Sequence, residues 1–329
     1  MTTTMTAAVL DTAGAAFRLA DVAMPEPAAG QVRVRIHASG VTPLDLKIHA
    51  GQAAHARHPL PAILGMELAG VVDAVGPGTT AFRRGDEVYG LTGGVGGVPG
   101  TLAEYAVVDA DLLAAKPANL AMREAAALPL NIITAWEGLV DRAAVGAGQS
   151  VLVLGVGGVG QVAIQIARAA GARVFAVASA TRAAAIEQLG ATPIDRALPV
   201  ADYVARHTGG RGFDLVYDTA GGPSLDAAFL AVRRFGHVVS CLGWGSHALA
   251  PLSFRAATYS GVFTLLPLLS GEGRAHHGEI LREAARLVEA GALRPELVAQ
   301  RFRLDAVDQA YRSIQAGPAA GKTVIDMIG

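Results

Sequence analysis

The sequence predicts an α/β protein of two domains, one of which is a doubly wound parallel sheet. Three observations lead to this fold class. The chain has 329 residues, and at about 150 residues per domain this length suggests two domains. Short strands and turns fill the first 120 residues, after which strands and helices alternate. A glycine-rich turn at residues 155–160 stands between one such strand and the helix that follows it.

The first 120 residues have the period-two pattern of half-buried strands. In residues 31–40, Val32, Val34 and Ile36 alternate with polar residues, so this segment is expected to be a strand with one buried face. Residues 67–76 and 86–91 are expected strands as well, whereas residues 93–100, GGVGGVPG, are expected to form a flexible loop.

The second part of the chain alternates between apolar runs and amphipathic segments. We expect strands at residues 151–155, 172–178, 213–221, 237–243 and 261–266, and helices at residues 161–171 and 183–190. The run at 151–155 is apolar throughout, as a parallel strand buried on both faces requires. A further helix is expected at 278–291, and a last strand at 322–327 that we assign to the first domain.

Composition excludes several classes of protein. Hydrophobic residues make up 52% of the chain and charged residues 17%, which excludes a largely disordered protein. The net charge is −1, so no basic surplus favours a nucleic-acid partner. The single cysteine, Cys241, excludes an internal disulfide framework and a multi-cysteine zinc site. The sequence shows neither a signal peptide nor a run of about 18 apolar residues, so we expect a cytoplasmic protein without a membrane partner.

The turn GVGGVG matches the GxGxxG pattern in the context that its mechanism requires, between a buried strand and a helix. The first glycine permits the tight turn, the second admits a pyrophosphate close to the backbone, and the third lets helix and strand pack closely. The helix N-terminus then offers N–H groups to phosphate oxygens. The residues expected to bind the cofactor here are Gly155, Gly157, Gly158, Val159 and Gly160.

The residues after the next strand indicate NADP(H) rather than NAD(H). An NAD site needs an acidic residue about 20 residues beyond the glycine motif to bind the ribose 2′-hydroxyl. Ser179 and Arg182 stand there instead, and no acid occurs before Glu187. A hydroxyl and a guanidinium suit a 2′-phosphate, and Arg196, after the following strand, is a second candidate contact. The alternative is that Arg182 is a solvated residue of a first helical turn.

These motifs together resemble the medium-chain dehydrogenase/reductase superfamily, in particular its zinc-free quinone oxidoreductase branch, the zeta-crystallin-like proteins. Residues 60–76 match the pattern P-x3-G-x-E-x2-G-x-V, and residues 38–51, 83–90 and 126–139 resemble the early loop, a following turn and strand, and the helix that enters the nucleotide domain. Leu154-Gly155-Val156 before the GGVG run departs from the branch and is closer to the zinc alcohol dehydrogenases, whereas Gln165 and Arg168 fit the branch.

The resemblance covers nearly the whole chain and implies a domain plan. It implies a chaperonin-10-like (GroES-like) catalytic domain formed by residues 1–122 and 262–329, around a Rossmann nucleotide-binding domain at residues 123–261. Alignment of the motifs places Thr42, Met66 and Leu130 where zinc-dependent relatives hold their catalytic zinc ligands. A hydroxyl, a thioether and an alkyl group do not make a zinc site, so no metal is expected. The clustered histidines His49, His55 and His58 are better explained as solvated loop residues.

The chemistry expected without a metal is hydride reduction of quinones or other activated conjugated carbonyl compounds. Conjugation already makes these acceptors reactive, so the protein mainly orients them beside the nicotinamide. An enoyl or enone reductase of the same superfamily and a non-catalytic, crystallin-like NADPH-binding module are the alternatives. A homodimer through a strand at residues 261–269 is also expected, since an apolar edge strand otherwise invites association.

Individual residues carry these expectations. Thr42 is the candidate catalytic hydroxyl, with a buried loop-capping role as the alternative, and Thr134 is expected near the nicotinamide or its phosphate, or else bonded to its own helix backbone. The candidate walls of the substrate slot, for each of which core packing is the alternative, are Met66, Leu130, Trp136 and Trp244. The residues expected along the cofactor edge are Thr219, Ala220, Leu242 and Gly243.

Overall fold

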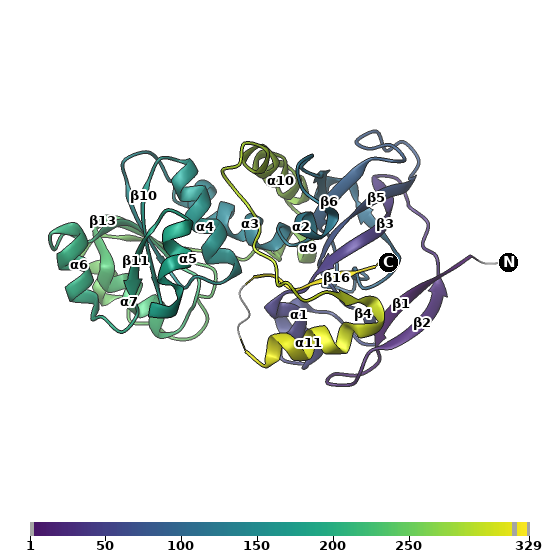
Figure 1. Ribbon diagram of the computed structural model, residues 1–329, viewed down its shortest axis with the longest axis horizontal. Coiled ribbons are helices and arrows are strands. Elements are labelled where there is room, and N and C mark those ends of the chain that lie inside the picture. Colours follow the sequence, from purple (N-terminus) through teal and green to yellow (C-terminus); the bar gives the residue numbers. More distant parts are fainter. Residues whose placement is uncertain (1–2, 318–320, 328–329) are drawn as a thin grey trace. The chain divides into compact units, whose positions relative to one another are not determined.

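The computed structural model describes residues 3–317 and 321–327 and divides into two compact units (Figure 1). The first unit is formed by Met1–Leu130 together with Leu265–Gly329, and the second by Asn131–Thr264. The first unit is therefore built from both ends of the chain. The boundaries expected from the sequence were 122 and 262.

The second unit is built on a six-stranded sheet in which every neighbouring pair is parallel. Its strands are β9 (Ser150–Leu154), β10 (Arg173–Ala178), β11 (Thr192–Asp195), β12 (Phe213–Asp218), β13 (Val232–Ser240) and β14 (Thr258–Gly261). They lie in the order β11-β10-β9-β12-β13-β14. The chain starts in the middle of the sheet, winds outward on one side and returns to the other, which confirms the doubly wound fold.

Helices cover both faces of this sheet. The helices of the unit are α4 (Gly158–Ala169), α5 (Ala183–Gln188), α6 (Val200–Thr208), α7 (Pro223–Ala231) and α8 (Ala250–Ser253). Leu152 and Leu154 of β9 belong to a buried cluster with residues of α6 and α7. The alternating residues Val151 and Val153 are also fully buried, and α4 packs on β9 and β10. Burial on both faces explains why the segment is apolar throughout.

The first unit holds a seven-stranded sheet and a smaller three-stranded one. The larger sheet runs β15 (Phe302–Arg303), β16 (Val324–Asp326), β3 (Gln31–Gly40), β5 (Glu67–Val75), β6 (Glu87–Leu91) and β8 (Leu113–Ala115), with β7 (Tyr105–Asp109) paired to β3. The smaller sheet is β2 (Arg18–Ala23), β1 (Thr4–Leu10) and β4 (Ala62–Ile63). Val32, Val34 and Ile36 are fully buried, as the alternation predicts. The C-terminal β16 pairs with β3, which confirms its expected place.

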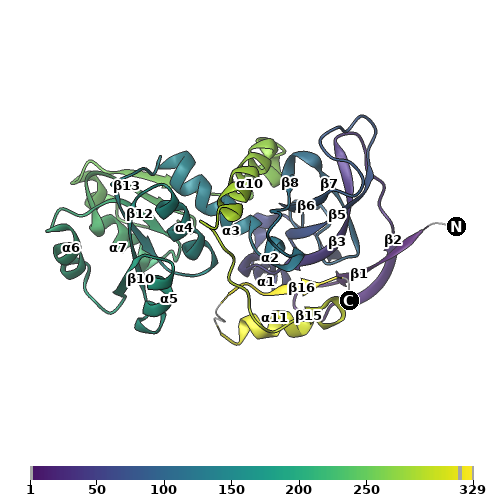
Figure 2. The ribbon, with the colours of Figure 1, turned by 45° about the horizontal axis from the view of Figure 1, so that its top comes forward.

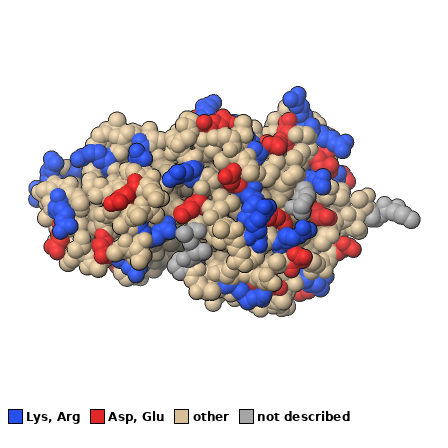
Figure 3. Space-filling model, in the orientation of Figure 1, with Lys and Arg blue, Asp and Glu red and all other residues tan. Residues whose placement is uncertain are grey.

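Three helices of this unit, α2, α10 and α11, contact strands of its larger sheet. The bounds in this unit are α1 (Pro43–His49), α2 (Met122–Ala126), α9 (Leu266–Ser270), α10 (Arg274–Glu289) and α11 (Val307–Gln315). Helix α3 (Pro129–Trp136) starts at the boundary and leads into a π-helix at Glu137–Arg142, which belongs to the second unit and contacts β13 and β14. Figure 2 shows α10 beside β6 and β8, with which it is in contact. Helix α2 contacts β3 and β5. On the face shown in Figure 3, positive and negative side chains are interspersed, and none of the described helices has the length and hydrophobicity needed to cross a bilayer.

Two sequence-based predictions of secondary structure are wrong. The strand expected at residues 261–266 lies earlier, at Thr258–Gly261, and the run that follows turns into α9. Pro267 stands at the start of α9, where its fixed φ and missing N–H favour a first helical turn. The expected dimer strand at 261–269 is therefore absent. Residues 43–49, expected in a loop, form α1, which also begins with a proline.

Candidate functional site

The glycine turn between β9 and α4 has the geometry that a dinucleotide requires. Gly155 follows β9 with φ of +88°, a left-handed conformation that costs a residue with a side chain. A Cβ on Gly160 would overlap the carbonyl oxygen of Gly155, whereas a Cβ on Gly157 would meet no atom within 4 Å. The turn therefore needs glycine at 160 to close and leaves open space at 157. Gly157 caps α4 without a side chain, which leaves amide groups of the first turn available to phosphate oxygens.

The residues expected near a 2′-phosphate gather where β10 and β11 end. Ala178 lies opposite Asp195 in the parallel pair, so Ser179 and Arg196 follow neighbouring strand ends. The amide of Arg196 donates to the carbonyl oxygen of Ala178 at 2.8 Å. Ser179 Oγ lies 2.9 Å from the hydroxyl oxygen of Thr181. Arg182 is partly buried and Arg196 is exposed, so this edge presents hydroxyl and guanidinium groups and no acid at the end of β10.

Thr219 joins the glycine turn to the end of β12. Its hydroxyl lies 3.0 Å from the carbonyl oxygen of Leu154 and 2.9 Å from that of Gly155, both acceptors. Ala220, the next residue, is exposed. The amide of Leu242 donates to Ser240 Oγ at 3.1 Å, and Gly243 is exposed beyond it. The predicted cofactor-edge residues thus follow β12 and β13 directly, at the carboxyl ends of the strands, where ligands bind in such sheets.

Thr134 belongs to a chain of hydroxyl groups within the second unit. Its hydroxyl oxygen lies 3.0 Å from that of Thr264, and Thr264 donates to Glu137 Oε2 at 2.8 Å. Because the one hydroxyl proton of Thr264 points to Glu137, Thr134 is the donor to Thr264. Tyr217 donates to the Thr134 carbonyl oxygen at 2.7 Å, and burial raises the pKa of Tyr217 well above its usual value. This chain places Thr134 in a well-packed polar network.

The hydroxyl of Thr42 caps α1. It accepts from the amide of Asp45 at 3.1 Å and donates to Asp45 Oδ2 at 2.7 Å, and the Thr42 amide donates to the same oxygen at 2.7 Å. Both residues are fully buried. Burial raises the pKa of Asp45 to about 6, against the lowering effect of the hydrogen bonds from Thr42. The hydrogen bonds of this hydroxyl are those of the capping alternative.

The four residues expected to wall a substrate slot differ in exposure. Met66 is fully buried, Leu130 and Trp136 are partly buried, and Trp244 is 54% exposed. Trp244 packs edge-on against Phe263, with ring centroids 6.0 Å apart. Met66 and Leu130 belong to the first unit and the two tryptophans to the second. Neither unit by itself brings the four together.

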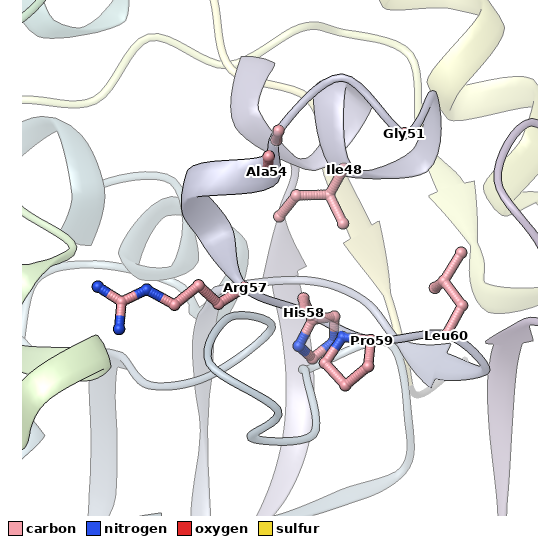
Figure 4. A pocket seen from close by; sticks show the side chains of 8 residues that line it. Ile48, Gly51, Ala54, Arg57, His58, Pro59 and Leu60 are labelled. Atoms are coloured by element: carbon pink, nitrogen blue, oxygen red, sulfur yellow. The ribbon is translucent and has the colours of Figure 1, made fainter.

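The first unit has an open pocket of about 420 Å³ that contains none of these four residues (Figure 4). Ile48 of α1 lies across it from His58 and Pro59. Arg57 beside them has φ of +47°, which is uncommon for a residue with a side chain. His58 Nε2 lies 3.3 Å from the Ile63 carbonyl oxygen, and burial lowers the pKa of His58. His58 was expected to be a solvated loop residue, and composition alone gave no signal for a pocket.

Both parts of the chain match families of known proteins. Residues 28–118 match the family model of the alcohol dehydrogenase GroES-like domain, and residues 189–325 match that of the zinc-binding dehydrogenases. A 2-methylene-furan-3-one reductase of Solanum lycopersicum is 35% identical over 94% of this chain and 74% of its own length. The human quinone oxidoreductase is 30% identical over 93% of this chain and 92% of its own length. The chain belongs to the medium-chain dehydrogenase/reductase superfamily, in its quinone oxidoreductase-like branch.

A solved structure supports this membership of the medium-chain dehydrogenase/reductase superfamily. An alcohol dehydrogenase superfamily protein from Novosphingobium aromaticivorans is 60% identical and superimposes with a TM-score of 0.97, covering 98% of this chain and all of that one. The superfamily resemblance and the α/β fold predicted from the sequence are confirmed. As a member of this superfamily, the protein is an oxidoreductase that uses a nicotinamide cofactor, and its glycine turn fits that group.

The positions that hold zinc in other medium-chain dehydrogenases have structural partners in this chain. The Thr42 hydroxyl caps α1 through its hydrogen bonds with Asp45, and the Met66 side chain is buried in the core. Glu67 beside it accepts from the Leu130 amide at 2.7 Å and pairs with Lys322 at 2.5 Å. The zinc-binding dehydrogenase model matches residues 189–325, a range that includes none of Thr42, Met66 and Leu130. Residues 3–317 and 321–327 contain no group of three or more His, Cys, Asp or Glu placed to hold a metal ion.

Proposed function

We propose that the protein catalyses NADPH-dependent, two-electron reduction of quinones or other activated conjugated carbonyl compounds, without a metal. The observation that carries this proposal is the chemistry at Thr42 and Met66. A buried, hydrogen-bonded hydroxyl and a buried thioether supply no Lewis acid to polarise an isolated carbonyl. Acceptors that are already polarised by conjugation do not need one.

The residues of the chain have distinct parts in this proposal. NADPH supplies the hydride when it is bound. The glycine turn at residues 155–160 and the first turn of α4 hold the phosphates, and Thr219 braces that turn through Gly155. An α,β-unsaturated carbonyl compound would receive the hydride at its β-carbon to give an enolate, and a quinone would be reduced by the hydride to the hydroquinone anion. Either anion would then take one proton from water. Because the proton of the Thr42 hydroxyl is donated to Asp45, we assign Thr42 a structural role.

The preference for NADPH rests on Ser179, Arg182 and Arg196. These residues follow β10 and β11 and offer a hydroxyl and two guanidinium groups where an NAD site carries an acid. Guanidinium groups bind phosphate through paired hydrogen bonds. The named activities of the tomato reductase and the human quinone oxidoreductase correspond to the two acceptor types in the proposal.

Two alternative functions can be distinguished from this proposal by measuring NADPH consumption. An enoyl or enone reductase would share the fold and differ in its acceptor, and a non-catalytic NADPH-binding module would bind without turnover.

We also propose a cytoplasmic homodimer. The apolar run at 262–269 is not a strand, so we propose that the two copies meet through β14 instead. Strand β14 pairs with β13 on one side and, among the described residues, with no strand on the other.

The test is consumption of NADPH by the purified protein with a matched panel of acceptors. We expect turnover with quinones and α,β-unsaturated ketones, no turnover with the corresponding saturated ketones, and a lower KM for NADPH than for NADH. Treatment with a chelator should leave the rate unchanged. Binding of NADPH without turnover on any acceptor would support the non-catalytic module, and loss of activity on chelation that zinc restores would contradict the metal-free proposal.

A further inference from the structure

One buried carboxylate organises the chain where β12 and β13 end. Asp218, the last residue of β12, is fully buried. Its Oδ1 accepts from the amides of Ala220 at 3.2 Å and Gly221 at 3.1 Å. Its Oδ2 accepts from Ser240 Oγ at 2.8 Å and from the Gly221 amide at 3.2 Å. Both oxygens are therefore used, and all the donors come from residues at the carboxyl ends of two neighbouring strands.

These hydrogen bonds fix the turn that carries Thr219. Asp218 precedes Thr219, and its carboxylate holds the two amides that follow, so Thr219 is anchored on both sides. From this position the Thr219 hydroxyl reaches the carbonyl oxygens of Leu154 and Gly155. Gly221 reverses the chain with φ of +72°. The carboxylate thus acts on the glycine turn through one intermediate residue.

The same carboxylate reaches the adjoining strand end. Ser240, which donates to Asp218, accepts from the amide of Leu242 at 3.1 Å. The amide of Cys241 donates to the main-chain carbonyl oxygen of Asp218 at 3.3 Å, a bond that does not involve the carboxylate. Ala220 and Gly243, which follow the two strands, are exposed. The Asp218 carboxylate therefore bonds both segments, the first directly and the second through Ser240.

A buried carboxylate is an expensive way to stabilise a fold. Removing an ionised carboxylate from water costs several kcal/mol unless hydrogen bonds compensate it, and an apolar core is often as stable. A negative charge beneath a site for phosphates also opposes anion binding. A group with these costs is understandable where the backbone must be held in one conformation, since charge-assisted hydrogen bonds are short and directional.

We infer that Asp218 is a positioning residue for the dinucleotide: it holds the Thr219–Gly221 turn and the 240–242 segment so that the glycine turn is set for the cofactor before the cofactor binds. This inference rests on the proposed function, since it concerns the site for NADPH. It adds a residue that touches no expected part of the cofactor and acts through Thr219 and Ser240.

The test compares Asp218→Ala with Asp214→Ala, a matched change in the same strand. Asp214 lies four positions earlier in β12, accepts from the Ser150 amide and hydroxyl at 2.8 and 2.6 Å, and pairs with Arg233. Both variants should unfold at lower temperature than wild type. Loss of hydrogen bonds to a charged group corresponds to about a tenfold or larger change in an equilibrium constant, so we expect the Kd for NADPH to rise by about that factor in Asp218→Ala only.

A second readout needs no cofactor. Amide hydrogen exchange of Ala220 and Gly221 should accelerate in Asp218→Ala without NADPH and stay unchanged in Asp214→Ala. Asp218→Asn keeps one acceptor oxygen and should give an intermediate Kd. If Asp218→Ala does not fold, Asp218→Asn and Ser240→Ala are expected to raise the Kd in its place.

The outcomes separate this inference from the proposed function. Unchanged NADPH affinity in Asp218→Ala would overturn the positioning role while leaving the proposed function intact. Equal loss of affinity in Asp214→Ala would overturn it too, because the effect would then follow general stability. Failure of the wild-type protein to bind NADPH or NADH would overturn the proposed function and the positioning role together.

Discussion

Replacing Asp45 with asparagine should change how stability depends on pH. The folded pKa of Asp45 is raised to about 6 from 3.8, chiefly by burial. The folded state therefore holds this proton more tightly than the unfolded state, and the free energy of unfolding falls as pH rises from about 4 to about 6. A shift of about two pKa units corresponds to about 3 kcal/mol. Ionised Asp45 therefore lowers the free energy of unfolding by this amount at neutral pH, whereas below pH 3.8, where the carboxyl is protonated in both states, it does not.

The assay is denaturant unfolding of wild type and Asp45→Asn at a series of pH values between about 4 and 7. The amide oxygen can still accept both hydrogen bonds from Thr42, so the cap is kept. Any cost of placing the amide nitrogen is the same at each pH. The stability of Asp45→Asn relative to wild type should therefore rise by about 3 kcal/mol across this range. A difference that is constant with pH would refute the reasoning.

Three further predictions follow from the described contacts. Gly157→Ala should lower the unfolding temperature only slightly, since its Cβ meets nothing within 4 Å and alanine is merely a poorer N-cap, but it should weaken NADPH binding in a fluorescence titration. Gly160→Ala, whose Cβ would overlap the Gly155 carbonyl oxygen, should lower the unfolding temperature more and weaken NADPH binding as well. Arg182→Ala should raise the KM for NADPH about tenfold and leave that for NADH unchanged; equal effects on both cofactors would contradict a 2′-phosphate contact. Lys322→Met should destabilise the protein by about 3 kcal/mol in denaturant unfolding, because it leaves the fully buried Glu67 carboxylate without its cation; an unchanged midpoint would show that the pair contributes little.

The sequence predicted the elements whose pattern is set by burial. The alternation in β3 and the apolar run of β9 follow from one and two buried faces, and both strands are confirmed. The glycine turn was also predictable, because position 155 has a positive φ and position 160 has no room for a Cβ, and glycine meets both requirements. An apolar run gives no such guide at 262–269, where a buried helix and a strand look alike and Pro267 was the better signal.

The role of single side chains was harder to predict because it depends on distant partners. Thr42 is the exception: threonine, then proline, then Asp45 three positions on is a helix-start signature that can be read from sequence. Asp218 and Ser240 are 22 positions apart and meet only when β12 and β13 pair. The buried pair of Glu67 and Lys322 likewise joins segments from opposite ends of the chain.

The central claim, hydride transfer from NADPH to a conjugated acceptor without a metal, has one direct test. Metal-depleted protein, checked by elemental analysis, would be given an α,β-unsaturated ketone and NADPH carrying deuterium at its hydride-donating carbon. We predict deuterium on the β-carbon of the saturated product, at the rate of untreated protein. Absence of deuterium there, or transfer that appears only after zinc is added back, would contradict the account.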